Sequence, residues 1–188
     1  PYWRQICWGH WVSTDMINWK NVKEAIVMDK DTSVKDGAWS GCASYKKDGT
    51  PVLFITAGDD AKINNSYSNQ NITIATPKDL NDPYLTEWEV SDDLVAQLDS
   101  SMGVSSQFRD PNVYYEDGTY YMFVGSSNHR YEGTTQVFTS KDDSFTNWQY
   151  QGELFRPKKY EDYMGSCWEL TNLVKLFNDD KTISKYLF

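Results

Sequence analysis

The chain has 188 residues and a net charge of −9. A surface this acidic offers no basic face to phosphates, which argues against a nucleic-acid partner, and no apolar run approaches the roughly 20 residues that span a bilayer, which argues against a membrane partner. The length suffices for one domain with a substantial core. Aromatic residues make up 15% of the chain, with 8 Trp and 13 Tyr, and this excess favours strands over helices.

The first predicted element in chain order is a strand, then a turn that carries an aspartate, then a tryptophan that opens another strand. It occurs three times, at 11–19, 74–88 and 137–148. The tryptophans that end the three copies, at positions 19, 88 and 148, are nearly evenly spaced. The aspartates are expected to form the turns, because Asp bonds its own backbone at such corners: Asp15, Asp79 and Asp142.

Predicted β-hairpins lie between these elements. Asp48-Gly49 and Asp117-Gly118 are each flanked by apolar and aromatic residues, which is a strong short-range hairpin signal. The interval between these two hairpins equals that between the first two tryptophans. A third copy at 173–183 follows after a slightly shorter interval, as the third tryptophan does. The two kinds of element therefore repeat in step.

A unit of four antiparallel strands that recurs at this interval is typical of a β-propeller blade. The alternative is a β-sandwich whose turns happen to be alike, which two elements in register disfavour. The sequence thus predicts an all-β fold. Residues 1 to about 30 would hold the outer strands of blade 1, 38–95 and 106–156 would be blades 2 and 3, and 166–188 would begin blade 4. About three blades leave the ring incomplete.

Two local expectations accompany this fold. Residues 94–98 could form a short turn of helix. Trp19, Trp88 and Trp148 are expected to pack in the core between blades rather than to serve as sugar platforms.

The innermost strand of a propeller blade begins near the central channel, so the residues just before each hairpin face one pocket. Three stretches would converge there: Trp39–Ala43, Phe108–Pro111 and Cys167–Leu170, with the loop Cys7–Trp11 one blade earlier. They bring two carboxylates, an arginine, a serine and several tryptophans. Aromatic faces and bidentate polar groups suit a sugar, and a pair of carboxyl groups is what glycoside hydrolysis needs.

Four motifs now carry a resemblance. They are Trp8-Gly9-His10-x-x-Ser13-x-Asp15-x-x-x-Trp19, Trp39-Ser40-Gly41-x-Ala43, Arg109-Asp110-Pro111 and Glu169. In order and spacing the chain resembles glycoside hydrolase family 32, the invertases, levanases, inulinases and related fructosyltransferases. The resemblance implies a five-bladed β-propeller, of which residues 1–188 would be a partial catalytic domain without the β-sandwich that usually follows.

The resemblance also implies roles for particular residues. Asp110 would stabilise the oxocarbenium-like transition state with support from Arg109, and Glu169 would be the general acid/base, which must hold a proton near neutral pH. Three further residues would line the fructosyl subsite: Trp8, Trp39 and Ser40.

Two departures from the family pattern limit the expected activity. Glu169-Leu170-Thr171 stands where the family usually has Glu-Cys-Pro. The family nucleophile, an Asp in an Asn-Asp-Pro-Asn motif, has no counterpart in these residues. We therefore expect a fragment of a retaining β-fructofuranosidase or fructanase, inactive by itself, that needs the remainder of the same enzyme or a complementary chain to close the propeller. Its substrate would be a fructoside such as sucrose, inulin or levan.

Two alternatives stay open: a related propeller glycosidase acting on arabinose or xylose, and a sugar-binding propeller without catalysis. No metal or other cofactor is expected. The cysteines, Cys7, Cys42 and Cys167, are odd in number and far apart, which argues against a disulfide framework and a zinc site. With only two histidines, His10 and His129, the sequence gives little support to a histidine metal site.

Overall fold

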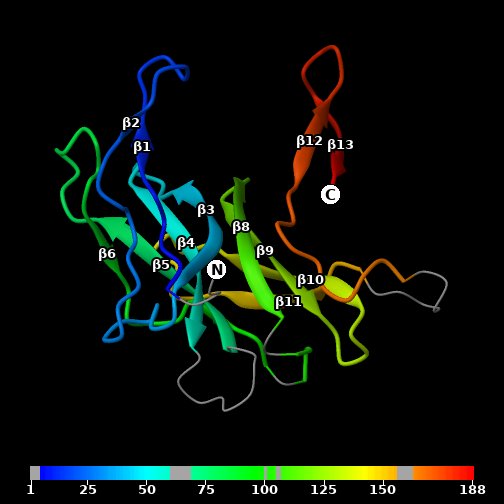
Figure 1. The fold of residues 1–188 in the computed structure, drawn as a ribbon. Coiled ribbons are helices and arrows are strands. Elements are labelled where there is room, and N and C mark those ends of the chain that lie inside the picture. Colours follow the sequence, from blue (N-terminus) through cyan, green and yellow to red (C-terminus); the bar gives the residue numbers. More distant parts are fainter. Residues whose placement is uncertain (1–4, 60–68, 100, 105–106, 156–162) are drawn as a thin grey trace.

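The computed structural model describes residues 5–59, 69–99, 101–104, 107–155 and 163–188. Within these ranges the regular elements are all strands, arranged in four sheets (Figure 1). No helix long and apolar enough to cross a membrane occurs in the described ranges. The prediction of an all-β fold is therefore confirmed.

The first large sheet, called blade 2 here, has its strands in the order of the chain. They are β3 (Ala38–Tyr45), β4 (Pro51–Asp59), β5 (Asn69–Pro77) and β6 (Trp88–Val90), all antiparallel. The short strand β7 (Ala96–Gln97) pairs with the other end of β5. The helical turn expected at 94–98 is thus wrong, because pairing with Asn71 and Ile72 holds this segment in an extended conformation.

The second large sheet, called blade 3 here, repeats the same meander. Its strands are β8 (Phe108–Glu116), β9 (Thr119–Ser127), β10 (Gly133–Ser140) and β11 (Gln149–Glu153), again in chain order and antiparallel. Asp117 and Gly118 both have positive φ at the β8–β9 turn, which suits the tight hairpin expected there.

Strand β4 shows how these sheets are stacked. Val52 and Phe54 enter a core shared with β8 and β9 of blade 3. Leu53 and Ile55, on the opposite face, enter a second core shared with the N-terminal segment, residues 5–37. A strand buried on both faces lies in a sheet with a neighbour on each side. This is the packing of successive blades, whereas each sheet of a two-layer sandwich has one solvated face.

Two short hairpins lie near the ends of the described chain and form separate two-stranded sheets (Figure 1). They are β1 (Trp11–Val12) with β2 (Lys20–Asn21), and β12 (Val174–Phe177) with β13 (Ile183–Leu187). Both expose large apolar side chains, among them Trp11, Phe177 and Leu187.

The repeated Asp turns form as expected. Asp15, Asp79 and Asp142 each accept a hydrogen bond from the backbone N–H two residues further on. In all three copies the residue three positions before the tryptophan has a positive φ, between 46° and 61°: Met16, Leu85 and Phe145. The same local fold therefore occurs three times.

The three tryptophans differ in burial. Trp148 lies between blades 2 and 3, with its ring 6.1 Å from that of Phe54, and Trp88 packs against the second core. Trp19 is 52% exposed, so the expectation of a core position is wrong for this residue. The two-stranded sheet beside it is too small to cover an indole.

Candidate active site

A β-bulge shapes the Arg-Asp-Pro stretch. Arg109 pairs with Gly125 and Asn112 with Phe123, so Asp110 and Pro111 together face a single residue of β9. Asp110 is 6% exposed and has a φ of 58°, a left-handed conformation that is uncommon for a residue other than glycine. The matching end of β3 is also irregular, with a register shift at Ser40. Both inner strands are thus distorted where the sequence predicts the pocket.

The segments of the two predicted catalytic carboxylates are joined directly. Arg109 donates from Nε and from Nη2 to Oε1 of Glu169, at 2.9 and 2.7 Å. Asp110 Oδ2 accepts the backbone N–H of Leu170 at 3.0 Å. Residues in successive repeats are therefore linked by a planar arginine fork and a bond to the main chain.

Two glutamines hold the arginine from its other side. Nη1 of Arg109 donates to Oε1 of Gln70 at 3.0 Å and to Oε1 of Gln107 at 2.8 Å. Gln70 is buried on β5, and the same oxygen accepts the backbone N–H of Phe108 at 3.1 Å. These contacts fix the direction of the guanidinium fork. Neither glutamine was among the residues predicted from the sequence. The bond from Gln70 joins blade 2 to blade 3.

A threonine connects the two bulges. The Thr56 hydroxyl donates to the Ser40 carbonyl oxygen at 2.7 Å and accepts the backbone N–H of Asp110 at 2.8 Å. Thr56 is fully buried on β4. Sequence reasoning missed it too, although Thr56 lies as far before Gly125 as one Asp-Gly hairpin lies before the next, so the two occupy equivalent positions of the repeat.

Two glycines let the chain around Glu169 approach blade 3. A Cβ built on Gly125 would lie 2.2 Å from the Trp168 carbonyl oxygen, and one on Gly133 would lie 2.3 Å from Cδ1 of the Trp168 ring. The Trp168 ring stacks on Phe155 with centroids 5.5 Å apart. Glu169 thus directly follows Trp168, which packs against the sheet of blade 3.

Burial and charge act in opposite directions on Asp110. Loss of solvation raises the pKa of its carboxyl group, while the Leu170 N–H and the Arg109 charge lower it. Glu169 differs in exposure, since its side chain is 59% exposed beside an Arg109 side chain that is 14% exposed. One carboxylate is thus buried and the other open to an incoming molecule.

The neighbouring thiols carry no activated nucleophile. Burial raises the pKa of Cys42 to about 11 and that of Cys167 to about 11. Both remain protonated thiols at neutral pH.

The aromatic residues predicted for the subsite are joined by a bond to the main chain. Nε1 of Trp8 donates to the Trp39 carbonyl oxygen at 2.8 Å. The Trp39 indole lies against Gly37 and Gly58, whose built Cβ atoms would be 3.3 and 3.2 Å from its Nε1. Ser40, next in the chain, is exposed at the bulge.

Leu170, which stands where the family pattern has Cys after the predicted acid/base residue, has a φ of 51° and a 60% exposed side chain. Its N–H still reaches Asp110. The departure from the family pattern therefore leaves the link between the two carboxylate segments in place.

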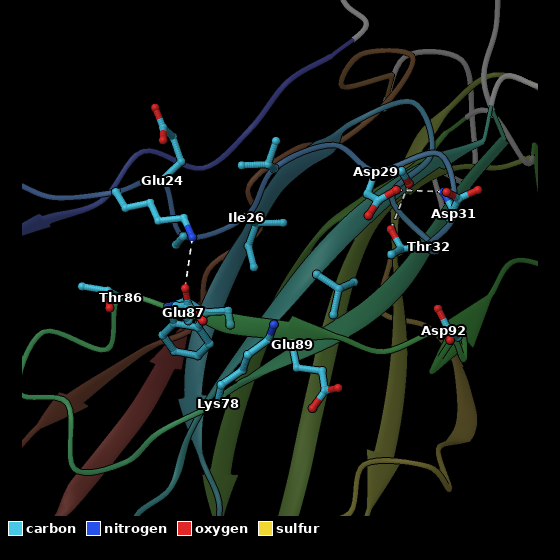
Figure 2. A pocket seen from close by; sticks show the side chains of 15 residues that line it. Glu24, Ile26, Asp29, Asp31, Thr32, Lys78, Thr86, Glu87, Glu89 and Asp92 are labelled. Carbon is cyan, nitrogen blue, oxygen red and sulfur yellow. Dashed lines mark hydrogen bonds and ion pairs between the residues drawn. The ribbon is translucent and has the colours of Figure 1, made fainter.

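A cavity of about 560 Å³ lies elsewhere, between the N-terminal segment and β6 (Figure 2). Its charged side chains are mostly acidic, and Lys23 pairs with Glu87 at 3.2 Å across it. None of the six predicted site residues lines it. The predicted sugar site therefore lies outside this cavity.

Comparison with known proteins decides the family. The sequence model of the glycosyl hydrolases family 32 N-terminal domain matches residues 1–188. The chain belongs to glycosyl hydrolase family 32. The resemblance inferred from the four motifs is thereby confirmed.

Relatives within family 32 include a fructan 1-exohydrolase from Bromus pictus, 36% identical over 79% of this chain and 23% of its own length. A β-fructofuranosidase, an insoluble isoenzyme from Arabidopsis thaliana, is 38% identical over 89% of this chain and 27% of its own. The chain thus spans about a quarter of the length of these curated relatives.

The solved structures support the fold. Fructan 1-exohydrolase IIa from Cichorium intybus matches 95% of this chain and 31% of its own with a TM-score of 0.79 at 24% identity. Sucrose-6-phosphate hydrolase from Lactobacillus gasseri matches 90% of this chain and 32% of its own, with a TM-score of 0.73 at 26% identity. The prediction of an incomplete five-bladed β-propeller is confirmed, since the family 32 N-terminal domain has this fold.

Proposed function

We propose that these 188 residues form part of a retaining glycosidase that cleaves β-fructofuranosyl linkages. One observation carries the proposal: the segments of Asp110 and Glu169, predicted from separate repeats, meet through Arg109 and the Leu170 N–H. The names of the relatives, fructan 1-exohydrolase and β-fructofuranosidase, agree with this chemistry.

In the proposed mechanism Glu169 protonates the glycosidic oxygen of the leaving group and later deprotonates the attacking water. Both bonds from Arg109 end on Oε1, so Oε2 is the oxygen that would carry the proton. Exposure of the Glu169 side chain suits transfer to an incoming substrate.

Asp110 has a different role in the same proposal. Its buried carboxylate would accept hydrogen bonds from fructosyl hydroxyls, which strengthen as positive charge develops on the ring. Arg109 would hold the two carboxylates in register, and three residues would wall the fructosyl subsite: Trp8, Trp39 and Ser40.

The nucleophile belongs to a motif that these residues do not contain. We therefore propose that the chain alone releases no fructose and that the residues closing the propeller, from the same polypeptide or from a complementary chain, supply this carboxylate. The domain limits proposed remain those of the sequence: outer strands of blade 1, blades 2 and 3, and the start of blade 4 within 1–188.

The alternatives have less support. Membership of family 32 favours fructosides over arabinosides and xylosides. A sugar-binding propeller without catalysis stays the competing function. A Glu→Gln variant of the Cichorium intybus fructan 1-exohydrolase IIa, 26% identical over 81% of this chain and 27% of its own with a TM-score of 0.69, was solved with 1-kestose, which makes this trisaccharide a suitable probe.

The test uses the complete polypeptide that contains this chain, with sucrose, inulin, levan and 1-kestose as substrates. Glu169→Gln should lower fructose release about 10²- to 10⁴-fold, the usual share of general acid catalysis. Glu89→Gln, at an exposed position of β6, serves as the matched control and should retain full activity.

The outcomes separate the alternatives. An unsubstituted polypeptide that binds 1-kestose without releasing fructose would identify a binding protein. Equal turnover by Glu169→Gln and the unsubstituted polypeptide would remove Glu169 from the acid/base role.

A further inference from the structure

We propose that Thr56 is a positioning residue for Asp110, acting from blade 2 on the carboxylate of blade 3; this inference rests on the function proposed above. Thr56 lies on β4, outside the motifs that carry the predicted catalytic residues. Its hydroxyl bonds the main chain at two points, one of which is the Asp110 N–H.

The backbone at Asp110 needs an external restraint. Its positive φ and the surrounding bulge leave it without a paired residue on β9. The Thr56 hydroxyl accepts that N–H at 2.8 Å. With 6% exposure, Asp110 has little water to replace this partner.

The orientation of the hydroxyl is itself fixed. Because Oγ1 donates its only proton to the Ser40 carbonyl at 2.7 Å, the hydroxyl meets the Asp110 N–H as an acceptor. Ser40 sits at the bulge of the neighbouring inner strand. One buried hydroxyl therefore ties together the two distorted strand ends that carry predicted site residues.

This link predicts a specific kinetic defect. A carboxylate that stabilises a transition state loses effect when it shifts by a fraction of an ångström, and a displacement of about 1 Å can cost 10²-fold in rate. Ground-state binding by the walls of the subsite would change less. Loss of the hydroxyl should therefore lower kcat more than it raises KM.

The experiment compares three variants of the complete polypeptide on sucrose and 1-kestose. Thr56→Val keeps the shape and removes the hydroxyl, and should lower kcat about 10- to 100-fold with KM changed less than threefold. Thr56→Ser keeps the hydroxyl and should restore kcat to within about threefold of the unsubstituted polypeptide.

Thr73→Val is the matched control. Thr73 is also fully buried in blade 2, and its hydroxyl bonds the Ser91 and Asp93 carbonyl oxygens at 3.1 Å, away from the site. Its loss should lower the melting temperature about as much as Thr56→Val does while leaving kcat unchanged. A purely structural role for Thr56 would give the two variants the same kinetics.

Amide exchange around Asp110 supplies a readout that does not need turnover. Thr56→Val should speed exchange of the Asp110 amide at least tenfold, and Thr73→Val should not. Active polypeptide with equal kcat for Thr56→Val and Thr73→Val overturns the inference and leaves the proposed function standing. If the unsubstituted polypeptide releases no fructose, the proposed function is overturned. If the Asp110 amide then also exchanges equally fast in Thr56→Val and Thr73→Val, Thr56 does not position Asp110.

Discussion

Blades 2 and 3 use one register position in opposite ways. Thr56 pairs with Trp39 in blade 2, and Gly125, one repeat later, pairs with Arg109 in blade 3. Thr56 contacts the next blade through its hydroxyl, at the Asp110 N–H. Gly125 has no side chain, and this allows the Trp168 carbonyl to lie directly against its backbone. A Cβ at this position would overlap that carbonyl.

Both contacts end beside a predicted catalytic carboxylate. Thr56 bonds the backbone of Asp110 itself, and Gly125 underlies Trp168, the residue before Glu169. In both cases a residue on the second strand of one blade contacts the segment of the next repeat that carries the carboxylate. A hydroxyl restrains a strained backbone, whereas a glycine permits a close approach.

The largest expected effect comes from filling the space at Gly125. In Gly125→Ala the new methyl group would lie 2.2 Å from the Trp168 carbonyl oxygen, so the backbone around Glu169 must move. Overpacking of this kind costs about 1–3 kcal/mol of unfolding free energy. Fructose release per folded molecule should fall at least about 100-fold, since the proposed acid/base group, Glu169, would be displaced.

Gly103→Ala is the matched control for that prediction. Its Cβ would lie 2.3 Å from the Ser127 carbonyl oxygen, a similar clash in blade 3 without contact to Trp168. Chemical denaturation and initial rates on sucrose should show similar losses of stability but a rate defect in Gly125→Ala alone. Equal rates for the two variants would mean that Gly125 does not determine the position of Glu169.

Local sequence patterns foretold the repeated parts of the fold. Asp48-Gly49 and Asp117-Gly118 indicate the hairpins because the positive φ of a tight turn depends on the turn residues themselves. Asp15 and Asp142 indicate turns because each bonds the backbone two residues further on. The four family motifs then indicated which strand ends carry the predicted site residues.

The contacts between blades could not be read in the same way. In the sequence, nothing distinguishes Gln70 from other polar strand residues. Its role becomes visible only in the fold, where Arg109 of the next blade donates to it. The exposure of Trp19 depends on how few strands surround it, and the pairing of Ala96 with β5 overrode a weak helical pattern. These features depend on which segments meet in space, which residue spacing alone does not encode.

Asp110→Asn tests whether the buried carboxylate of Asp110 lowers the free energy of unfolding. Burial raises the pKa of Asp110 above the value of about 3.9 expected in an unfolded chain, so its ionised form disfavours folding above the folded-state pKa. Asparagine is neutral, tolerates a left-handed backbone and can still accept the Leu170 N–H. We expect a gain on the order of 0.5–1 kcal/mol at pH 7 together with loss of fructose release.

The gain should depend on pH with a definite sign. As the pH falls through the folded-state pKa, Asp110 becomes protonated and its destabilising effect is relieved. Urea unfolding of Asp110→Asn and the unsubstituted polypeptide should therefore differ at pH 7 and converge at acid pH. An Asp110→Asn variant that is less stable than the unsubstituted polypeptide at pH 7, with a deficit that shrinks on acidification, would show that the ionised carboxylate stabilises the fold.

The smallest effect is expected where blade 3 meets the C-terminal hairpin through charge. Glu116, at the end of β8, accepts bonds from Lys175 of β12 at 2.9 Å and from the hydroxyl of Tyr186 of β13 at 3.0 Å. The Lys175 bond, followed by that of Tyr186, lowers the pKa of Glu116. Its stabilising contribution is therefore present above the unfolded-state value of about 4.3 and is lost as the pH falls through the folded-state pKa.

Glu116→Gln should consequently speed amide exchange in β12 and β13 by about two- to fivefold at pH 7, the range of exposed ion pairs, with less difference from the unsubstituted polypeptide below about pH 4. Glu87→Gln removes the exposed Lys23 pair at the other side of the structure and should leave exchange in this hairpin unchanged. Unaltered exchange in Glu116→Gln would mean that the glycine contact under Trp168 and the aromatic contact of Phe123 with Phe188, 5.5 Å between centroids, are enough to hold the hairpin against blade 3.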